Sequence, residues 1–347
     1  MSQSYKNAGV DISAGDAASR LAAAAAKTTF AGRAGKIGAP VDLPGGFAGV
    51  LDFGDFYLVQ CCDTVGTKID LVQQTGDFSG MGYDLLAMVA DDAVCLGAEV
   101  VSLTNTFETG SIDAEKIGAM MNSLAEACRE QNIVIAGGEI AEVGAKVQGT
   151  SWGADAIGIV EKDKVITGER VRAGDVLLAL QENGFRCNGY SLVRKILKEI
   201  SAEKSLVEQC IRPSTVYHSA VLALCGRYGQ PSTVSISGIA HITGGGIPGN
   251  VFRILKNGLG AKFHTLFSPP EEMIVLAQQG NVSTQELYEV WNGGNGMILA
   301  LPEREVEKAL SLLQNMNVSA QICGEVTNSG RIDLVAWNGE QLLYERE

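Results

Sequence analysis

Residues 56–68 read FYLVQCCDTVGTK, an apolar run of strand length that ends in a turn rich in polar groups. We expect a buried strand over 56–62, because a short apolar run bounded by turn residues is typical of strands inside a sheet. Strand and helix patterns alternate on both sides of this run. The predicted strands cover 99–107, 132–139, 154–160, 176–180 and 232–241, and the predicted helices cover 16–29, 82–96, 113–130, 189–200, 214–226 and 247–256. This alternation predicts α/β or α+β layers in which helices cover sheets.

The chain has 347 residues, about twice the usual domain size, so we expect two domains. A charged, turn-forming stretch at 161–175 separates two series of predicted strands. We therefore place the boundary near residue 170, with an N-terminal domain over 1–170 and a C-terminal domain over 171–347. Before the first strand, residues 31–49 are rich in Gly and Pro, and loops of this length are uncommon unless they are functional or disordered.

Composition and charge exclude several classes of protein. The net charge of −13 argues against a surface for nucleic acid or anionic lipid, although a small phosphorylated ligand needs only a local positive pocket. Eight cysteines without a C-x-x-C pair and three histidines are poor material for a zinc site. The polar N-terminus does not read as a signal peptide, and no apolar run approaches the roughly 18 residues of a membrane span. We therefore expect a soluble, cytoplasmic protein.

The turn that follows the first strand offers the groups that bind a Mg²⁺-phosphate complex. Asp63 could hold the cation, and Gly66 would let the backbone approach a phosphate. Thr67 and Lys68 would offer a hydroxyl and an ammonium group to the phosphate oxygens. A capped turn without a ligand is the alternative explanation.

Three carboxylates stand in the otherwise apolar helix predicted over 82–96, and Asp92 lies beside Asp91. Asp84 and Asp91 are seven residues apart, which places them two turns apart on one face. Buried carboxylates are costly unless they are paired or bind a metal. The alternative is that these aspartates mark the wet side of the helix.

Two glycine-rich segments also follow predicted strands. Gly137-Gly138-Glu139 stands where α/β sheets place their ligands, outside the carboxyl end of a strand, although an ordinary turn explains it too. Residues 241–246 read HITGGG, and three glycines with exposed N–H groups at a helix start form a nest for an anion. A tight connection is the alternative there, and His241 alone would more often be a structural histidine.

Familiar nucleotide and nucleophile motifs are missing. The sequence contains no G-x-x-x-x-G-K-[ST] phosphate loop, no G-x-G-x-x-G opening a βαβ unit and no G-x-S-x-G elbow. Dispersed carboxylates and glycine-rich anion sites therefore indicate Mg²⁺-nucleotide chemistry on an unfamiliar set of loops.

Taken in order, these segments resemble the aminoimidazole ribonucleotide synthetase family, also called phosphoribosylformylglycinamidine cyclo-ligase. The matching pieces are SYKNAGVDISAG (4–15), GGFAG (45–49), DTVGTK (63–68), GYDLLAMVADDAVCLGAE (82–99), GGEIAE (137–142), CNGYSLVRKIL (187–197), HITGGGIPGNVFRIL (241–255) and NGGNGM (292–297). The first piece together with NGYSLVRK and HITGGG is specific to this family within its superfamily.

The resemblance implies a two-domain, PurM-like α/β (α+β) fold. An N-terminal sheet domain pairs in a homodimer, with an ATP site near that interface, and an α/β sandwich domain follows it. The implied reaction is the ATP- and Mg²⁺-dependent ring closure of formylglycinamidine ribonucleotide to aminoimidazole ribonucleotide in purine biosynthesis. The alternatives are a catalytically lapsed or substrate-altered nucleotide-binding homologue and a related kinase or selenophosphate-type enzyme, although the 31–49 loop lacks the cysteine that the last would need.

The resemblance also assigns roles to residues of this chain. Asp63, Asp91 and Glu139 are implied metal ligands, and Lys68, His241 and Asp84 are implied catalytic residues. The implied nucleotide- and phosphate-binding residues are Gly45, Gly46, Thr67, Lys68, Asn188, Thr243, Gly244, Gly245 and Gly246. The chain departs from the family pattern at Thr64, Asp91, Arg186, Cys187 and Gly249, where the family usually has Gly, Asn, His, Ser and Glu.

Overall fold

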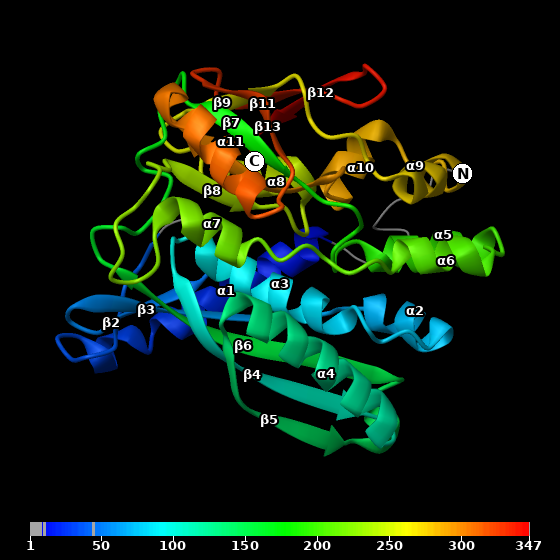
Figure 1. The fold of residues 1–347 in the computed structure, drawn as a ribbon. Helices are drawn as coiled ribbons and strands as arrows, with labels where there is room; N and C mark the ends of the chain where they lie inside the picture. The colour runs from blue at the N-terminus through cyan, green and yellow to red at the C-terminus, as the bar shows by residue number, and fades with distance from the viewer. Residues whose placement is uncertain (1–8, 10–11, 44–45, 347) are drawn as a thin grey trace.

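Two sheets, one in each half of the chain, dominate the computed structural model, which describes residues 9, 12–43 and 46–346 (Figure 1). The first sheet has the order β1-β2-β3-β6-β4-β5. Its strands are β1 (Ala39–Pro40), β2 (Gly49–Asp52), β3 (Phe56–Thr64), β4 (Glu99–Thr109), β5 (Val134–Glu142) and β6 (Thr150–Glu161). Neighbouring strands are antiparallel except β4 and β5, which are parallel and are joined through α4 (Ala114–Gln131).

The second sheet has the order β13-β12-β9-β11-β7-β10-β8. Its strands are β7 (Val176–Gln181), β8 (Gly238–His241), β9 (Gly260–Phe263), β10 (Asn295–Leu301), β11 (Ala320–Thr327), β12 (Arg331–Val335) and β13 (Gln341–Glu345). Every residue of β10 is buried, because both faces of this inner strand are covered. The chain passes from the first sheet to the second between residues 161 and 176, and the domain boundary near residue 170 stays a prediction.

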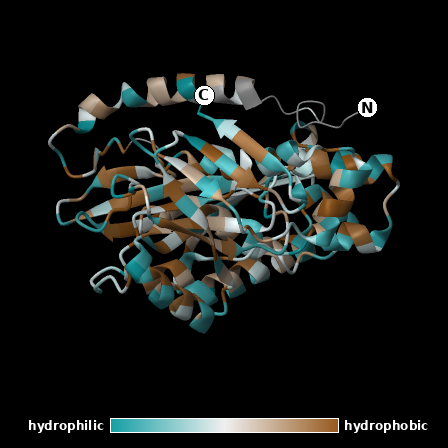
Figure 2. Cartoon of the chain, turned by 90° about the horizontal axis from the view of Figure 1, so that it is seen from above, coloured by the Kyte–Doolittle hydropathy of each residue, from teal (hydrophilic) through white to brown (hydrophobic). Residues whose placement is uncertain are grey.

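The remaining elements are helices that cover or join the sheets. They are α1 (Ile12–Lys27), α2 (Lys68–Thr75), α3 (Met81–Val94), α5 (Tyr190–Glu199), α6 (Lys204–Cys210), α7 (His218–Cys225), α8 (Gly246–Val251), α9 (Glu271–Gln279), α10 (Thr284–Val290) and α11 (Val306–Asn315), with single turns η2 (Phe30–Arg33), η3 (Gly144–Lys146) and η4 (Glu303–Glu305). Helix α1 runs along the outside of the molecule, and the side chains described in it are exposed (Figure 2). Among the described residues, none of these helices combines the length and the apolar character that crossing a bilayer requires.

Helix α3 is the central element of the molecule. It packs against β3, β6 and α4 on the side of the first sheet and against α7 of the second half (Figure 1). Only Tyr83 and Asp92 of its residues are not fully buried. At Gly82 a Cβ would lie 2.0 Å from the backbone nitrogen of Leu124, so glycine is what allows α3 and α4 to approach closely here.

Most predicted elements are confirmed, with differences at their ends. Asp113 caps α4 and accepts a hydrogen bond of 3.2 Å from the Lys116 N–H. The strand expected over 232–241 begins only at Gly238, and the helix expected over 247–256 ends at Val251. Helix α5 begins after Gly189, which is its cap residue. The reason is that Gly189 has a φ of 74° and lies against Trp291, a position that only glycine can take.

The cysteines are all unpaired, and only Cys62 is exposed. Seven of the eight are therefore small residues of the protein interior. None of the buried seven is needed as a staple, because a chain of this length closes two apolar cores without disulfides.

A buried histidine helps to join the two halves of the chain. His218, at the start of α7, is fully buried, and its Nε2 accepts a hydrogen bond of 2.9 Å from the Val100 N–H of β4. Burial, together with the nearby charge of Arg227, lowers the pKa of His218 to about 3. The neutral ring is therefore the form that the folded protein holds.

We expect His218→Gln to make stability less sensitive to acid, because the glutamine carbonyl can accept the same bond but cannot titrate. His218 is protonated in the unfolded chain below its ordinary pKa of about 6.5, but in the folded chain only near pH 3. Its contribution to stability is therefore complete above pH 6.5 and is lost as the pH falls towards 3. Between pH 7 and pH 5 the wild type should lose about 2 kcal/mol more unfolding free energy than the variant.

Urea unfolding of both proteins at pH 8, 7, 6 and 5 measures this difference. The pH 8 value gives the packing cost of the substitution and is the reference. Parallel loss of stability in the two proteins from pH 7 to pH 5 would contradict a neutral, buried His218.

Candidate functional site

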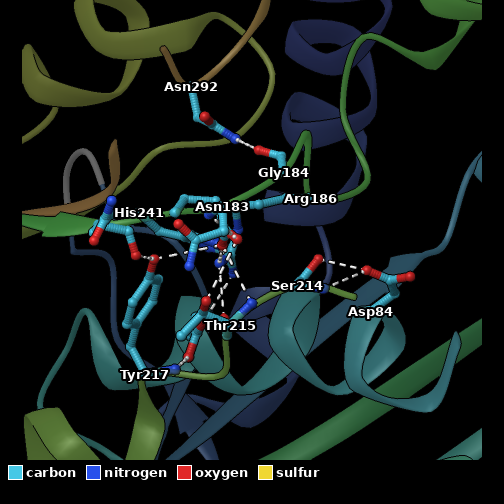
Figure 3. Close-up of polar contacts among 12 residues, drawn as sticks. Asp84, Asn183, Gly184, Arg186, Ser214, Thr215, Tyr217, His241 and Asn292 are labelled. Carbon is cyan, nitrogen blue, oxygen red and sulfur yellow. Dashed lines mark hydrogen bonds and ion pairs between the residues drawn. The ribbon is translucent and has the colours of Figure 1, made fainter. Parts of the chain in front are cut away.

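The two carboxylates that the sequence places on one face of α3 are both fully buried, and each meets a cation. Lys68 Nζ lies 2.7 Å from both oxygens of Asp84 and donates a hydrogen bond of 2.6 Å to the Arg212 carbonyl. Asp84 Oδ1 also accepts from the backbone N–H and the hydroxyl of Ser214 (Figure 3). The Lys68 ammonium therefore faces Asp84 rather than an open pocket, and a contact between Lys68 and a phosphate stays a prediction.

Asp91 is paired with Arg186 of the second half. Arg186 Nη2 donates to Asp91 Oδ2 at 2.7 Å, and Nη1 donates to Glu182 Oε2 at 2.7 Å. The other oxygen of Asp91 accepts a hydrogen bond of 2.9 Å from the Tyr217 N–H. Both oxygens of Asp91 are thus used inside the protein. Asp91 and Arg186 are two of the departures from the family pattern, and they compensate each other's charge.

The next residue of the helix, Asp92, faces a different partner. Its Oδ1 lies 2.7 Å from Nδ1 of His241, at the end of β8, and the His241 Nε2 lies 2.7 Å from Arg186 Nη2. Burial raises the pKa of Asp92 to about 7, against the lowering effect of Arg253 and Arg186. Burial, with Arg186 adding to it, lowers the pKa of His241 to about 3.

Asp63, at the end of β3, is a second carboxylate close enough to Asp92 for their charges to interact. Burial raises its pKa to about 6, opposed by the Thr64 N–H that it accepts at 2.6 Å and assisted by the charge of Asp92. Two carboxylates in such surroundings are costly as anions, so a cation between them would be favourable. Among residues 9, 12–43 and 46–346, however, no cluster of three or more Asp, Glu, His or Cys side chains is placed to hold a metal ion.

Glu139 lies away from this pair. The register pairs Asp63 with Ala154, Asn105 and Gly138 across the sheet, whereas Glu139 falls in the row of Thr64, Gly153 and Thr106. Because side chains alternate along a strand, Glu139 and Asp63 point to opposite faces. They are also three strand spacings of about 4.8 Å apart, about 14 Å in all. The structure therefore does not gather Asp63, Asp91 and Glu139 within one chain.

The predicted phosphate segments do come together. A Cβ on Gly66 would lie 3.5 Å from the Cys187 carbonyl, and one on Gly244 would lie 3.6 Å from the Asn188 side-chain nitrogen. The turn at 63–67, the Cys187-Asn188 segment and the loop at 243–246 are thus neighbours. Asn188 Oδ1 is buried and has no hydrogen-bond partner among the described residues. This orphaned acceptor indicates a polar ligand beside the glycine loop.

The loop at 243–246 is held in a conformation that leaves some of its backbone N–H groups without an acceptor among the described residues. The Asn250 side chain donates to the carbonyls of Gly244 and Gly246 at 3.1 and 2.8 Å. The N–H groups of Gly244 and Gly245 donate to no acceptor in the part of the chain that the structure describes. Gly245 has a φ of 89°, which puts successive N–H groups on one concave side. The loop can therefore accept an anion.

The glycine-rich segment before the first sheet docks beside the same site. Arg253, just after α8, donates to the Gly46 carbonyl at 2.7 Å and stacks on Phe47, 3.7 Å from the ring centroid. Gly45, predicted to contact the nucleotide, lies outside the described residues. Arg253 also faces Asp92, whose pKa it lowers. It therefore links the loop to the carboxylate pair.

Three residues of the site were missed by sequence reasoning: Asp92, Arg186 and Arg253. Asp92 stands next to Asp91, and the pattern of the helix does not tell which of the two adjacent carboxylates pairs with Arg186 and which with His241. Arg186 was noted only as a departure from a pattern, although an arginine amid apolar residues is a sequence signal of a buried ion pair.

The fold places the chain in a known structural class. It superposes on the hydrogenase maturation protein HypE from E. coli with a TM-score of 0.63 at 18% identity, covering 83% of this chain and 85% of that one. It superposes on T. maritima PurL complexed with ADP with a TM-score of 0.57 at 14% identity, covering 86% of this chain and 45% of that one. The two-domain, PurM-like α/β fold expected from the sequence is confirmed.

Sequence comparison then gives the family. The model of the AIR synthase related protein N-terminal domain matches residues 45–160, and that of the C-terminal domain matches residues 172–336. The chain belongs to this family. It is 36% identical over 315 residues to the phosphoribosylformylglycinamidine cyclo-ligase of Thermococcus kodakarensis, covering 89% of this chain and 91% of the relative. It is 31% identical to the same-named protein of Methanocaldococcus jannaschii, covering 98% and 99%.

We expect Lys68→Met to destabilise the protein by about 3–5 kcal/mol, because it leaves Asp84 buried without its cation. The double variant Lys68→Met/Asp84→Leu should recover most of this loss, since no buried charge remains. Lys162→Met is the control, because its ion pair with Asp52 is exposed and contributes at most about 1 kcal/mol.

Denaturant unfolding of the four proteins at pH 7 measures these differences. Equal stability of the Lys68 and Lys162 single variants would show that the ammonium is solvated rather than buried against Asp84.

Proposed function

We propose that this chain catalyses the ATP-dependent ring closure of formylglycinamidine ribonucleotide to 5-aminoimidazole ribonucleotide, releasing ADP and phosphate. The names of the full-length relatives support this activity rather than that of a lapsed homologue. The observation that carries the proposal is the meeting of the turn at 63–67, Asn188 and the loop at 243–246 beside Asp92. Three segments far apart in sequence thus bring phosphate-binding and cation-binding groups to one place.

The residues of this site fit a nucleotide and its Mg²⁺ in part. Asp63 and Asp92 would hold the cation, and the free N–H groups of Gly244 and Gly245 would take phosphate oxygens. Asn188 would bind a ligand donor through its unpartnered oxygen. Two carboxylates are too few to surround Mg²⁺, so the remaining positions fall to water and phosphate oxygens, as is usual for this ion.

The reaction needs a leaving group rather than a protein nucleophile. Transfer of the ATP γ-phosphoryl group to the formamide oxygen breaks its bond to ADP, forms a new O–P bond and leaves the formyl carbon bearing a phosphate ester. The ring-closing nitrogen then attacks the activated carbon, the new C–N bond forms, and the C–O bond breaks as phosphate leaves. When bound, Mg²⁺ would neutralise charge on the polyphosphate. The chain's own groups position the reactants and exclude water.

In this scheme His241 orients the Asp92 carboxylate and does not exchange protons with the substrate. Its two ring nitrogens are both engaged by Asp92 and Arg186, and its ring is fully buried. The catalytic roles expected for Lys68 and Asp84 remain predictions, since both are buried in one ion pair. Arg253 would hold the segment at 46–47 over the site.

We expect Asp63→Asn and Asp92→Asn each to lower kcat by about 10²–10³, because each removes charge that the cation requires. The assay supplies formylglycinamidine ribonucleotide, ATP and Mg²⁺ and follows the release of ADP and aminoimidazole ribonucleotide. Asp333→Asn, an aspartate of β12 in the second sheet, is the control and should keep wild-type turnover.

The wild-type protein could fail to form product and hydrolyse ATP only when another acceptor is present. That result would show that the substrate is a different compound. Full activity in both site variants would remove the cation site from the proposal.

We also propose that the chain is a homodimer formed through the open face of the first sheet. The strands β3, β4 and β6 leave Leu58, Ile157, Ile159 and Val101 half-buried or exposed on this face, opposite α3. Apolar side chains gathered on one sheet face favour burial against a partner. Glu139 lies on this same face, so a role for it at a nucleotide site would require the second copy.

We expect Ile157→Glu to convert a dimer into a monomer, since the new carboxylate would be buried without a partner. Size-exclusion chromatography with light scattering measures the mass of the protein as it elutes. Leu343→Glu, which changes an exposed leucine of β13 in the second sheet, is the control and should remain dimeric. A wild-type chain that elutes as a monomer at micromolar concentration would refute this interface.

A further inference from the structure

Arg186 occupies an unusual place in the fold. It is fully buried, and its backbone has a φ of +58°, a left-handed conformation that side chains other than glycine and asparagine rarely adopt. The segment around it is fixed, because the Asn292 side chain donates to the Gly184 carbonyl at 2.8 Å (Figure 3). Strain of this kind persists only where surrounding contacts over-determine it, and it is concentrated at functional sites.

Its guanidinium group is held from several sides at once. Asp91 and Glu182 each accept a bond of 2.7 Å, the Thr215 carbonyl accepts one of 2.9 Å, and the Tyr217 ring centroid lies 5.2 Å away. Formally, one positive charge meets two negative charges, so Arg186 stays protonated. A planar group with this many partners has one orientation, which also fixes where the second N–H of Nη2 points.

That N–H determines the state of His241. A guanidinium group can only donate hydrogen bonds, and Arg186 Nη2 lies 2.7 Å from His241 Nε2. Nε2 must therefore carry a lone pair, which leaves the ring proton on Nδ1. Nδ1 lies 2.7 Å from Asp92 Oδ1 and so donates to it. Arg186 thus donates to both Asp91 and His241, and His241 in turn donates to Asp92.

We propose that Arg186 is a positioning residue of the site, which fixes His241 as the Nδ1–H tautomer and through it aims the Asp92 carboxylate. This inference rests on the proposed function in one respect, that Asp92 binds the cation of the reaction. Oδ2 of Asp92 takes part in no hydrogen bond with the residues that the structure describes, so the aimed carboxylate keeps one oxygen for a ligand. Removing a residue that orients a metal-binding group typically lowers metal affinity or activity by about 10–100-fold.

The test uses the ring nitrogens of His241 as the readout. The chain has only three histidines, so ¹⁵N-histidine labelling gives a spectrum that His218→Gln and His264→Gln assign. In the wild type, we expect a protonated Nδ1 and an unprotonated Nε2 whose resonance is shifted by a donor. In Arg186→Gln/Asp91→Asn, which removes one charge of each sign, that Nε2 shift should be lost.

Function is measured on the same proteins. The affinity for Mn²⁺ alone, followed by electron paramagnetic resonance, should fall about 10–100-fold in the double variant, and kcat should fall over the same range. Arg186→Lys keeps the cation and a donor, so it should restore part of the shift and of the affinity. Glu99→Gln/Arg227→Gln removes another ion pair between the two halves and should change neither.

Two outcomes would overturn the inference. One is a wild-type His241 that carries its proton on Nε2, which needs no variant to detect. The other is a folded double variant, or Arg186→Lys if the double variant does not fold, with unchanged Nε2 resonance and unchanged Mn²⁺ affinity. A wild-type protein without cyclo-ligase turnover would sink the proposed function alone, because the resonance and the Mn²⁺ affinity are read without substrate.

Discussion

Two carboxylates in the middle of an apolar helix constrain the rest of this structure. Asp84 and Asp91 have no access to water, and a buried anion is tolerated only next to a cation and donors. The cation for Asp91 comes from the second half of the chain, and Lys68, the cation for Asp84, is itself bound by the Arg212 carbonyl of that half. The two halves must therefore meet at α3 in one relative placement. An apolar interface alone would allow them to slide.

The same constraint places the site. Arg186 can neutralise Asp91 only if the segment before α5 lies against α3, and this brings Asn188 beside the loop at 243–246. The turn at 63–67 is brought to Cys187 because Lys68 follows it and must reach Asp84. Contacts that satisfy buried charge are thus also the contacts that assemble the phosphate-binding segments. Stability and function share these residues, so variants there need readouts that separate the two.

Local sequence patterns predicted the helices and strands well, but they predicted the contacts between these elements less well. The strand at 56–62, the helix over 113–130 and the two series of strands follow from periodicity and turn residues, which act over a few residues. The pairing of Asp91 with Arg186 spans 95 positions, and no local rule determines it. For buried carboxylates the sequence left open a pair, a metal or a wet face. The structure selects the pair for Asp84 and Asp91, and Asp92 is the one that remains partly exposed.

Helix geometry explains why one residue position matters so much here. Adjacent residues on an α-helix point about 100° apart, so Asp91 and Asp92 make their direct contacts with different side chains. Asp91 points to Arg186, whereas Asp92 points to His241 and the end of β3. The alternation of side chains along a strand likewise separates Asp63 from Glu139, since neighbouring positions face opposite sides of the sheet. A motif gives the order of carboxylates along the chain, and only the register of the sheet and the turn of the helix decide which of them share a cation.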